Sequence, residues 1–433
     1  MSRNVVLVTA DSLRADHCGY MGYGRDTTPT LDRMAADGLV FENAVSPGPS
    51  TPESMSATHT GEFLKPYYTG EEDSAIVHRR ESIRRHLSRN PTIADELSKA
   101  GYTTIGFSPN PFTSRHFGFQ RGFDHYEDFL AESRTLGIYD RLFERFVSGQ
   151  TSLTPIRLFL NWVEGEEIFK SWEQYYEDVL AQVRAAEEPF FLWVFLLDTH
   201  LPYLVDRHRR DGVSWLDMWR YNLRLYTGDE DPFTEAERRE LVSLYDSTVK
   251  LVDSFLDRLT SDLGEYDPAY VFHGDHGEAF GEHGTYGHDP FMYEENIHVP
   301  YVVSNVGRSG RYERAVSLRT IPSAIADIAD IDDPFGTGLP SEAGESPVLC
   351  NPFGKRSAFR TRAEKFIWTG DLPDGNAELY DLEADPGEAR DLSEERPEAA
   401  DGWRRLGRSR VDEETERLRV SNAVEDVLAE AEL

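Results

Sequence analysis

Apolar and polar positions along this chain fall into short apolar runs and longer amphipathic stretches. Runs such as 190–197 are apolar at nearly every position, which is typical of a strand buried on both faces. The stretch from about Thr234 to Leu263 instead has apolar residues at helical spacing, which predicts one long amphipathic helix. We expect strands at 5–10, 39–45, 102–107, 190–197, 269–273 and 299–304, and helices at 29–37, 52–60, 91–99, 234–263 and 321–331.

This alternation of strands and helices predicts an α/β fold, with a doubly wound, mostly parallel sheet covered by helices on both faces. After residue 331 the chain becomes rich in Gly, Pro and Asp, which indicates a boundary. We expect a catalytic domain at 1–335 with a helical insertion at 131–187, a small α+β subdomain at 336–393 with strands at 358–368 and 378–382, and an acidic, helical or partly disordered tail at 394–433.

The charge balance is strongly acidic, with 45 Lys+Arg against 78 Asp+Glu and a formal net charge of -33. Acidic residues are spread over the whole chain, which favours adaptation to high salt and argues against nucleic acid or anionic membranes as partners. The apolar runs are too short to cross a bilayer. Residues 1–4 lead straight into the first strand, so we expect no targeting segment and a cytoplasmic protein.

The pentapeptide Gly274-Asp275-His276-Gly277-Glu278 directly follows an apolar run and carries the clearest chemical signal. A lone Asp-His pair after a strand is usually a helix cap and a surface histidine. Here the flanking glycines allow close approach of the backbone, and Asp11 stands at the end of another apolar strand. Because parallel strands of an open α/β sheet end at one edge, Asp11, Asp275 and His276 are predicted to hold a metal. Asp11 by itself could be a turn residue, but its position at the end of an apolar strand makes it a good ligand candidate.

A possible nucleophile stands at the start of the helix predicted at 52–60. Ser50 and Thr51 precede Pro52, and the simplest interpretation of both is helix capping. A hydroxyl at a helix N-terminus also lies beside free N–H groups, and a divalent metal would lower its pKa enough for nucleophilic attack. Position alone does not choose between Ser50 and Thr51.

Further polar residues follow other predicted strands. His200 comes after the strand at 190–197, and His288 lies in a glycine-rich stretch; each alone is more often structural. Beside a metal, the two could bind an anionic substrate or protonate a leaving group. Asn110 is a candidate anion contact, whereas His283 is expected to be structural. The two cysteines, Cys18 and Cys350, match no disulfide framework or metal-binding spacing.

Taken in order, these segments resemble the sulfatase family of the alkaline phosphatase superfamily, nearly from end to end. The matching segments are 11–17, 27–32, 51–61, 101–104, 118–126, 200–203, 274–278, 293–300, 378–382 and 385–388. The resemblance implies an alkaline phosphatase-like sheet and one divalent metal ion (Ca²⁺, Mg²⁺, Mn²⁺ or Zn²⁺). It also implies a small anionic ester as substrate. The implied metal ligands are Asp11, Thr51, Asp275 and His276, and the implied contacts of the substrate are His200 and His288.

Counting back from Thr60-Gly61, the resemblance places Thr51 at the nucleophile position. Sulfatases of the classical type carry a Cys or Ser there, which is modified to formylglycine, and threonine cannot be modified in this way. Ser12 stands where a second aspartate is usual, and no lysine stands near Asn110. With the acidic composition, this pattern resembles a haloarchaeal-like member that uses threonine.

Three functions remain open. The first is a metal-dependent hydrolase of a sulfate or phosphate ester, in which Thr51, His200 and His288 are catalytic and Asn110 joins the histidines in substrate binding. The second is a transferase of the same superfamily that passes the phospho group to an alcohol. The third is a catalytically inactive binding protein with the same fold. The oligomeric state is not predicted.

Overall fold

A computed structural model describes residues 3–67, 75–129, 170–227, 233–288, 290–336, 347–370 and 375–431. Its centre is an eight-stranded sheet in the order β10-β2-β9-β6-β1-β5-β3-β4. Among these strands only β9 runs antiparallel to its neighbours, so the mostly parallel sheet is confirmed. The strands are β1 Val5–Ala10, β2 Leu39–Val45, β3 Thr103–Phe107, β4 His125–Glu127, β5 Phe190–Leu196, β6 Ala269–Gly274, β9 Tyr301–Ser304 and β10 Gly310–Ser317.

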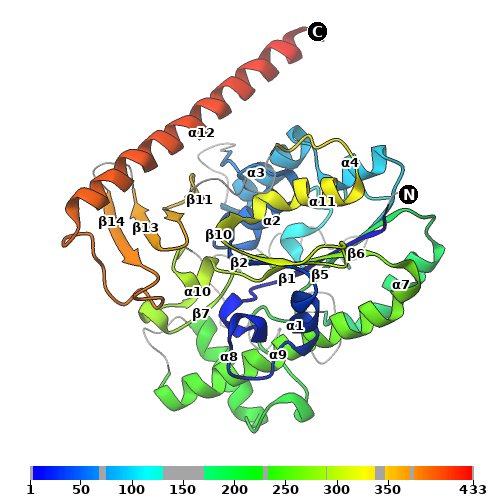
Figure 1. The fold of residues 1–433 in the computed structure, drawn as a ribbon, viewed down its shortest axis with the longest axis horizontal. Helices are drawn as coiled ribbons and strands as arrows, with labels where there is room; N and C mark the ends of the chain where they lie inside the picture. The colour runs from blue at the N-terminus through cyan, green and yellow to red at the C-terminus, as the bar shows by residue number, and fades with distance from the viewer. Residues whose placement is uncertain are drawn as a thin grey trace.

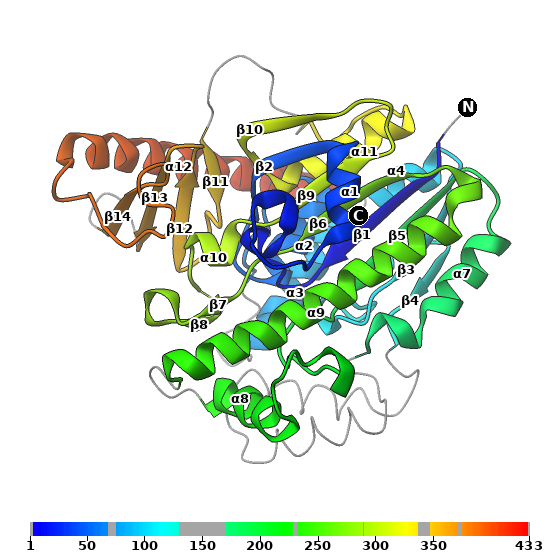
Figure 2. The same ribbon diagram turned by 60° about the horizontal axis from the view of Figure 1, so that its bottom comes forward.

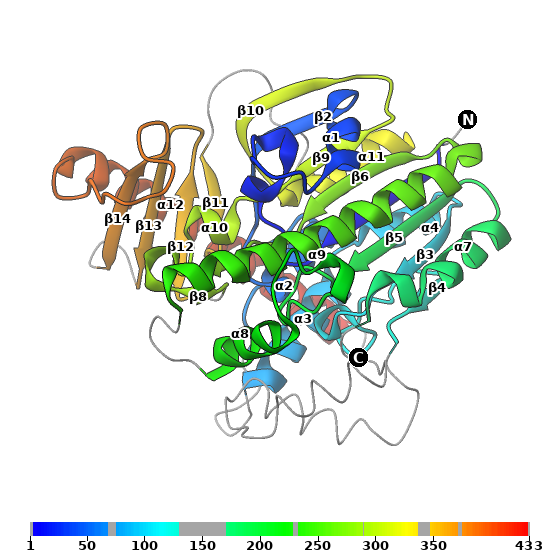
Figure 3. The same cartoon turned by 90° about the horizontal axis from the view of Figure 1, so that it is seen from below.

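Helices cover both faces of this sheet, as the alternating pattern predicts (Figure 1). One face carries α1 (Pro29–Ala36), α7 (Tyr176–Ala185) and α9 (Glu235–Asp262), and α9 lies lengthwise over the central strands (Figure 3). The other face carries α2 (Thr51–Thr60), α3 (Ala75–Arg89), α4 (Ile93–Lys99) and α11 (Ile321–Ala329). The helix α8 (Trp215–Thr227) packs against α9.

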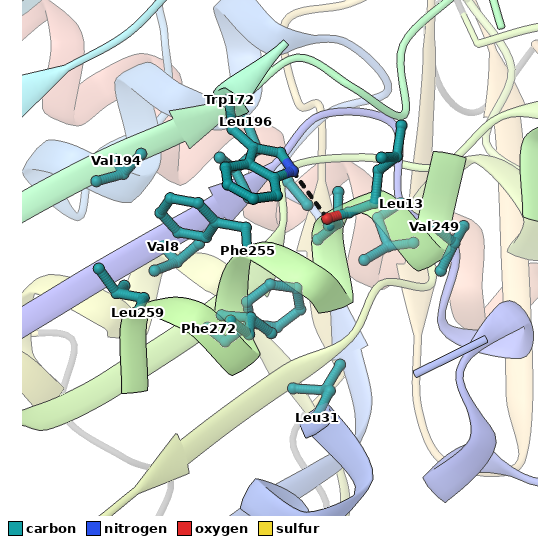
Figure 4. Packing of buried hydrophobic residues seen from close by; sticks show 14 of the residues in the cluster. Val8, Leu13, Leu31, Trp172, Val194, Leu196, Val249, Phe255, Leu259 and Phe272 are labelled. Carbon is teal, nitrogen blue, oxygen red and sulfur yellow. Dashed lines mark hydrogen bonds between the residues drawn. The ribbon is translucent and has the colours of Figure 1, made fainter. Parts of the chain in front are cut away.

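The sheet separates two hydrophobic cores because side chains of each strand alternate between its faces. On the α9 side, Val8 and Phe272 from adjacent strands pack with Phe255 of α9 (Figure 4). Trp172 packs in the same core and donates its indole N–H to the main-chain carbonyl of Leu251 at 2.9 Å (Figure 4). The indole N–H of Trp172, a buried polar group, therefore has a hydrogen-bond partner.

Helix starts follow capping chemistry. The side chain of Thr234 accepts from the N–H of Glu237 at the start of α9, and Glu237 bonds back to Thr234, which forms a capping box. Thr92 and Asp95 form the same box in α4. The predicted helix start at Pro91 is therefore wrong by two residues, because Thr92 is the cap.

A smaller antiparallel sheet lies at the β10 end of the large sheet (Figures 1 and 2). It contains β11 (Val348–Cys350), β12 (Arg356–Arg360), β13 (Glu364–Thr369) and β14 (Asn376–Asp381) and is followed by the long helix α12 (Pro397–Ala431). The single strand predicted at 358–368 is wrong. Thr361 turns the chain there by accepting the N–H of Glu364 on its hydroxyl, which leaves two paired strands.

Most of the insertion predicted at 131–187 lies outside the described residues. Its described part, from residue 170 onward, includes α7. Among the helices of the described segments, none has the length and apolar character needed to span a membrane.

Candidate metal centre and active site

The strand register brings two predicted ligands to one point at the carboxyl edge of the sheet. In the parallel pairing of β1 with its neighbours, Ala10 lies opposite both Gly274 of β6 and Leu196 of β5. The ladder continues for one more step, since Asp11 donates its N–H to Leu196 at 2.9 Å and Asp275 donates to Ala10 at 3.1 Å. Asp11 and Asp275 therefore leave adjacent strands at the same level.

Two glycines of the pentapeptide are required by close backbone contacts. A Cβ at Gly274 would lie 2.5 Å from the carbonyl oxygen of Leu13, and one at Gly277 would lie 2.1 Å from that of Glu295. Such distances are far inside van der Waals contact. Only glycine therefore lets the loop after β6 pack between its two neighbouring segments.

Asp11, Asp275 and His276 form a compact, buried group whose possible ligand atoms all lie within 4.8 Å of one another. The Nδ1 atom of His276 donates to the carbonyl of Gly277 at 2.9 Å, so the lone pair of this imidazole is on Nε2. Nε2 lies 3.6 Å from Asp11 and 3.5 Å from Asp275. Two carboxylates and one imidazole lone pair therefore converge, which is a donor set for a divalent cation.

Burial makes the metal-free charges of this group costly. It raises the pKa of Asp11, and the nearby Asp275 raises it further. It also raises the pKa of Asp275 to about 6 and lowers that of His276 to about 4. Within the described residues, Oδ2 of Asp275 has no hydrogen-bond partner. An unpartnered carboxylate oxygen beside a second buried carboxylate fits a cation, which would balance both charges.

Thr51, the first residue of α2, faces this group with its side chain. Its hydroxyl lies 3.3 Å from Nε2 of His276 and 3.4 Å from the side-chain nitrogen of Asn110. The same nitrogen of Asn110 donates to Asp11 at 2.7 Å. Ser50 instead directs its hydroxyl to Glu53. The structure therefore places Thr51, rather than Ser50, beside the cluster.

His200 and His288 lie next to this group and are only partly buried, unlike Asp11, Asp275 and His276. The ring of His288 lies 4.3 Å from that of His276 and 5.7 Å from that of His200, measured between centroids. Nδ1 of His288 contacts the buried carboxylate of Glu278 at 3.1 Å. Burial acts to raise the pKa of Glu278, but His288 and the neighbouring histidines outweigh it, so this pKa is lowered.

The structure thus brings together the residues that the sequence singled out for this site, except Ser50, whose hydroxyl contacts Glu53. His283 lies elsewhere: its ring bridges Glu295 and the carbonyl of Glu388. Sequence reasoning gave no role to Glu278, although it closes the pentapeptide, nor to Ser54, whose hydroxyl donates to the carbonyl of Asp275 at 2.6 Å. Ser54 lies one turn after Thr51, and this spacing was its only sequence signal.

Comparison with known proteins defines the class to which this fold and site belong. The model of the sulfatase family matches residues 3–331. The chain belongs to the sulfatase family and is a sulfatase-family hydrolase.

Relatives align over most of the chain. An arylsulfatase of Clostridium perfringens is 25% identical, with 94% of both chains covered. A Delta 4,5-hexuronate-2-O-sulfatase of Bacteroides thetaiotaomicron is 23% identical, with 90% of this chain and 85% of that protein covered.

Solved structures share the fold at low identity. A 2-O GAG sulfatase superposes with a TM-score of 0.68 at 16% identity, covering 97% of this chain and 94% of the other. A phosphonate monoester hydrolase of Agrobacterium radiobacter gives a TM-score of 0.65 at 16% identity, covering 97% and 95%. These likenesses support the alkaline phosphatase-like architecture expected from the sequence.

Proposed function

We propose that this protein is a metal-dependent hydrolase of a sulfate or phosphate ester, with Thr51 as its nucleophile. The observation that carries the proposal is the position of the Thr51 hydroxyl, 3.3 Å from Nε2 of His276 in the buried Asp11–Asp275–His276 group. Sulfate-ester cleavage by the related sulfatases makes a sulfate ester the first substrate to test.

Asp11, Asp275 and His276 would hold one divalent ion, with Thr51 beside it. The unpartnered Oδ2 of Asp275 and the raised pKa values of both aspartates support this assignment. When bound, such an ion supplies positive charge that lowers the pKa of a nearby hydroxyl and offsets charge on the ester oxygens. The donor set fits Ca²⁺, Mg²⁺, Mn²⁺ or Zn²⁺.

The chain's own residues would carry the bond changes. Oγ1 of Thr51 attacks the sulfur or phosphorus in line as its proton passes to solvent, and the bond to the leaving oxygen breaks. The rings of His200 and His288 lie 5.7 Å apart between centroids, and the two would bind the anionic group; one of them would protonate the leaving oxygen. Asn110 holds Asp11 and lies near Thr51, so it would also orient the substrate. Water then releases the group from Thr51.

The alternative is transfer of the group to an alcohol. Hydrolysis and transfer share the covalent step on Thr51 and differ only in the final acceptor, which is water in one case and an alcohol in the other. Products formed with and without added glycerol distinguish transfer from hydrolysis. An inactive binding protein is disfavoured by the complete donor set around Thr51. We further propose, from composition, a cytoplasmic protein adapted to high salt, without nucleic acid as a partner.

The decisive test changes Thr51 within the full-length protein. Thr51→Val keeps the shape but removes the hydroxyl, and we expect turnover to fall by at least about 10³-fold while the divalent ion stays bound. Thr51→Ser retains a hydroxyl and should keep part of the activity, and Ser50→Ala should keep most of it. Aryl sulfate, phosphate monoester and phosphate diester would be assayed in concentrated KCl, with and without chelator. Normal turnover by Thr51→Val would refute the nucleophile assignment.

A further inference from the structure

The short helix α10 (Glu294–Ile297) is tied to all three segments that carry the proposed ligands. The last carbonyls of a helix lack partners within it, and here they accept N–H groups from elsewhere. The carbonyl of Asn296 accepts from Gly277 at 2.8 Å, that of Ile297 from Ser46 at 2.9 Å, and that of His298 from Ala15 at 3.1 Å.

Each of these donors lies close to a site residue along the chain. Gly277 directly follows His276, and Ala15 lies four residues after Asp11. Ser46 begins the segment between β2 and Thr51. A shift of α10 would therefore displace the proposed ligands and the proposed nucleophile together.

The other end of α10 is held by the small C-terminal sheet, which lies beside it (Figure 2). The carboxylate of Glu294 contacts Arg360 of β12 at 3.0 Å and Lys365 of β13 at 3.2 Å. Lys365 also contacts Glu388 at 3.0 Å, and Glu388 accepts the N–H of Glu294 at 2.6 Å. The first residue of α10 is thus held by its side chain and its main chain.

The contact between α10 and the small sheet depends on buried charges of opposite sign. Arg360 and Lys365 lie directly opposite each other on adjacent antiparallel strands, and both are buried. Two cations in this position repel, and burial without counter-charges would be strongly unfavourable. Glu294, from the catalytic part of the chain, lies between them and contacts both. Glu388 and Glu294 together balance these two cations, and the share that Glu294 supplies, including the carboxylate beside Arg360, is present only when α10 is docked in this place.

We propose that Lys365 and Arg360 are positioning residues of the active site, through which the small sheet sets the place of α10 and hence of the metal ligands. The inference rests on the proposed function, because it concerns the same metal site. It gives the C-terminal sheet a role in catalysis, although none of its side chains is among the site residues identified above.

The test measures Mn²⁺ affinity by calorimetry on the full-length, chelator-treated protein, together with kcat and KM. Lys365→Met should weaken Mn²⁺ binding about tenfold, by analogy with residues that orient metal ligands, and should lower kcat more than it raises KM. Arg360→Lys keeps the charge but loses the forked contact with Glu294, so it should act in the same direction and serves if Lys365→Met does not fold.

The matched control is Leu392→Ala. Leu392 packs in the core on the opposite face of the small sheet, with Phe366 and Trp368. This variant destabilises the same sheet without touching the charge network, so its Mn²⁺ affinity should stay within about twofold of wild type. Equal affinities in Lys365→Met, Arg360→Lys and Leu392→Ala, at comparable loss of thermal stability, would overturn the inference while the proposed function stands. Failure of wild type to bind Mn²⁺ would overturn the metal site itself.

Discussion

Asp275→Asn should stabilise the metal-free protein while it destroys the proposed metal site. Asp275 and Asp11 are both fully buried, and their possible ligand atoms lie within 4.8 Å of each other and of His276. Without a cation, two ionised carboxylates in this position repel and are poorly solvated. Asparagine keeps the shape of the side chain and still offers Oδ1 to the N–H groups of Ser12 and His276, which Asp275 accepts at 3.0 and 2.7 Å.

The size of the effect follows from the geometry in two ways. Unit charges 4–5 Å apart repel by about 3–4 kcal/mol at an effective dielectric constant of 20. Burial raises the pKa of Asp275 from 3.8 to about 6, although the hydrogen bonds from Ser12 and His276 act to lower it. That change corresponds to about 3 kcal/mol once the carboxyl is ionised. The first value is the repulsion between the two carboxylates and the second is the cost of burying Asp275, so they are separate contributions of similar size. We take the smaller, about 3 kcal/mol, as the minimum gain expected.

The direction of the stability change and its dependence on pH follow from the linkage between proton binding and folding. A raised pKa means that the folded state holds the proton more tightly, so stability falls as pH rises from about 4 to about 6 and stays low above it. In chelator, urea unfolding should therefore show Asp275→Asn to be more stable than wild type at pH 8 and nearly equal to it at pH 4. Added Mn²⁺ should stabilise wild type alone. A variant less stable than wild type at pH 8 in chelator would refute this electrostatic account.

Three further outcomes test other features. Gly277→Ala should cost at least about 2 kcal/mol in stability and lower activity, because its Cβ would lie 2.1 Å from the carbonyl of Glu295; unchanged thermal unfolding would contradict this contact. The hydrogen bond to Glu295 raises the pKa of His283 to about 9, so its stabilising contribution should be present below about pH 6.5 and lost as pH rises to 9. His283→Gln should flatten that part of the pH profile of thermal unfolding. The net charge of -33 predicts a melting temperature that rises steeply with KCl, and a salt-independent value would argue against adaptation to high salt.

The fold could be predicted where local pattern and tertiary environment agree. Strand β2 was predicted at 39–45 and is found at Leu39–Val45, because Gly38 precedes it and the turn residues Ser46-Pro47-Gly48 follow it. The segment 358–368 was predicted as one strand because its turn at 361–363 contains neither glycine nor proline, so no local sequence signal marks a break there. The antiparallel direction of β9 left no local signal, since direction depends on the path of the connection.

For the candidate site, the sequence by itself determined which residues stand at strand and helix ends, because apolar runs and turn residues are local properties. Asp11, Asp275 and His276 were found in this way, as was the pair Ser50 and Thr51, of which the family resemblance favoured Thr51. Only the tertiary structure decided that Thr51 rather than Ser50 faces the cluster. It also showed that Glu278 contacts His288, and that the end of α10 accepts hydrogen bonds from the segments that follow β1, β2 and β6. The contact between Thr51 and His276 depends on strand register and helix rotation, which arise from packing between segments 225 residues apart in the chain. Glu278 and His288 are only 10 residues apart, but the path of the loop between them has no local sequence signal.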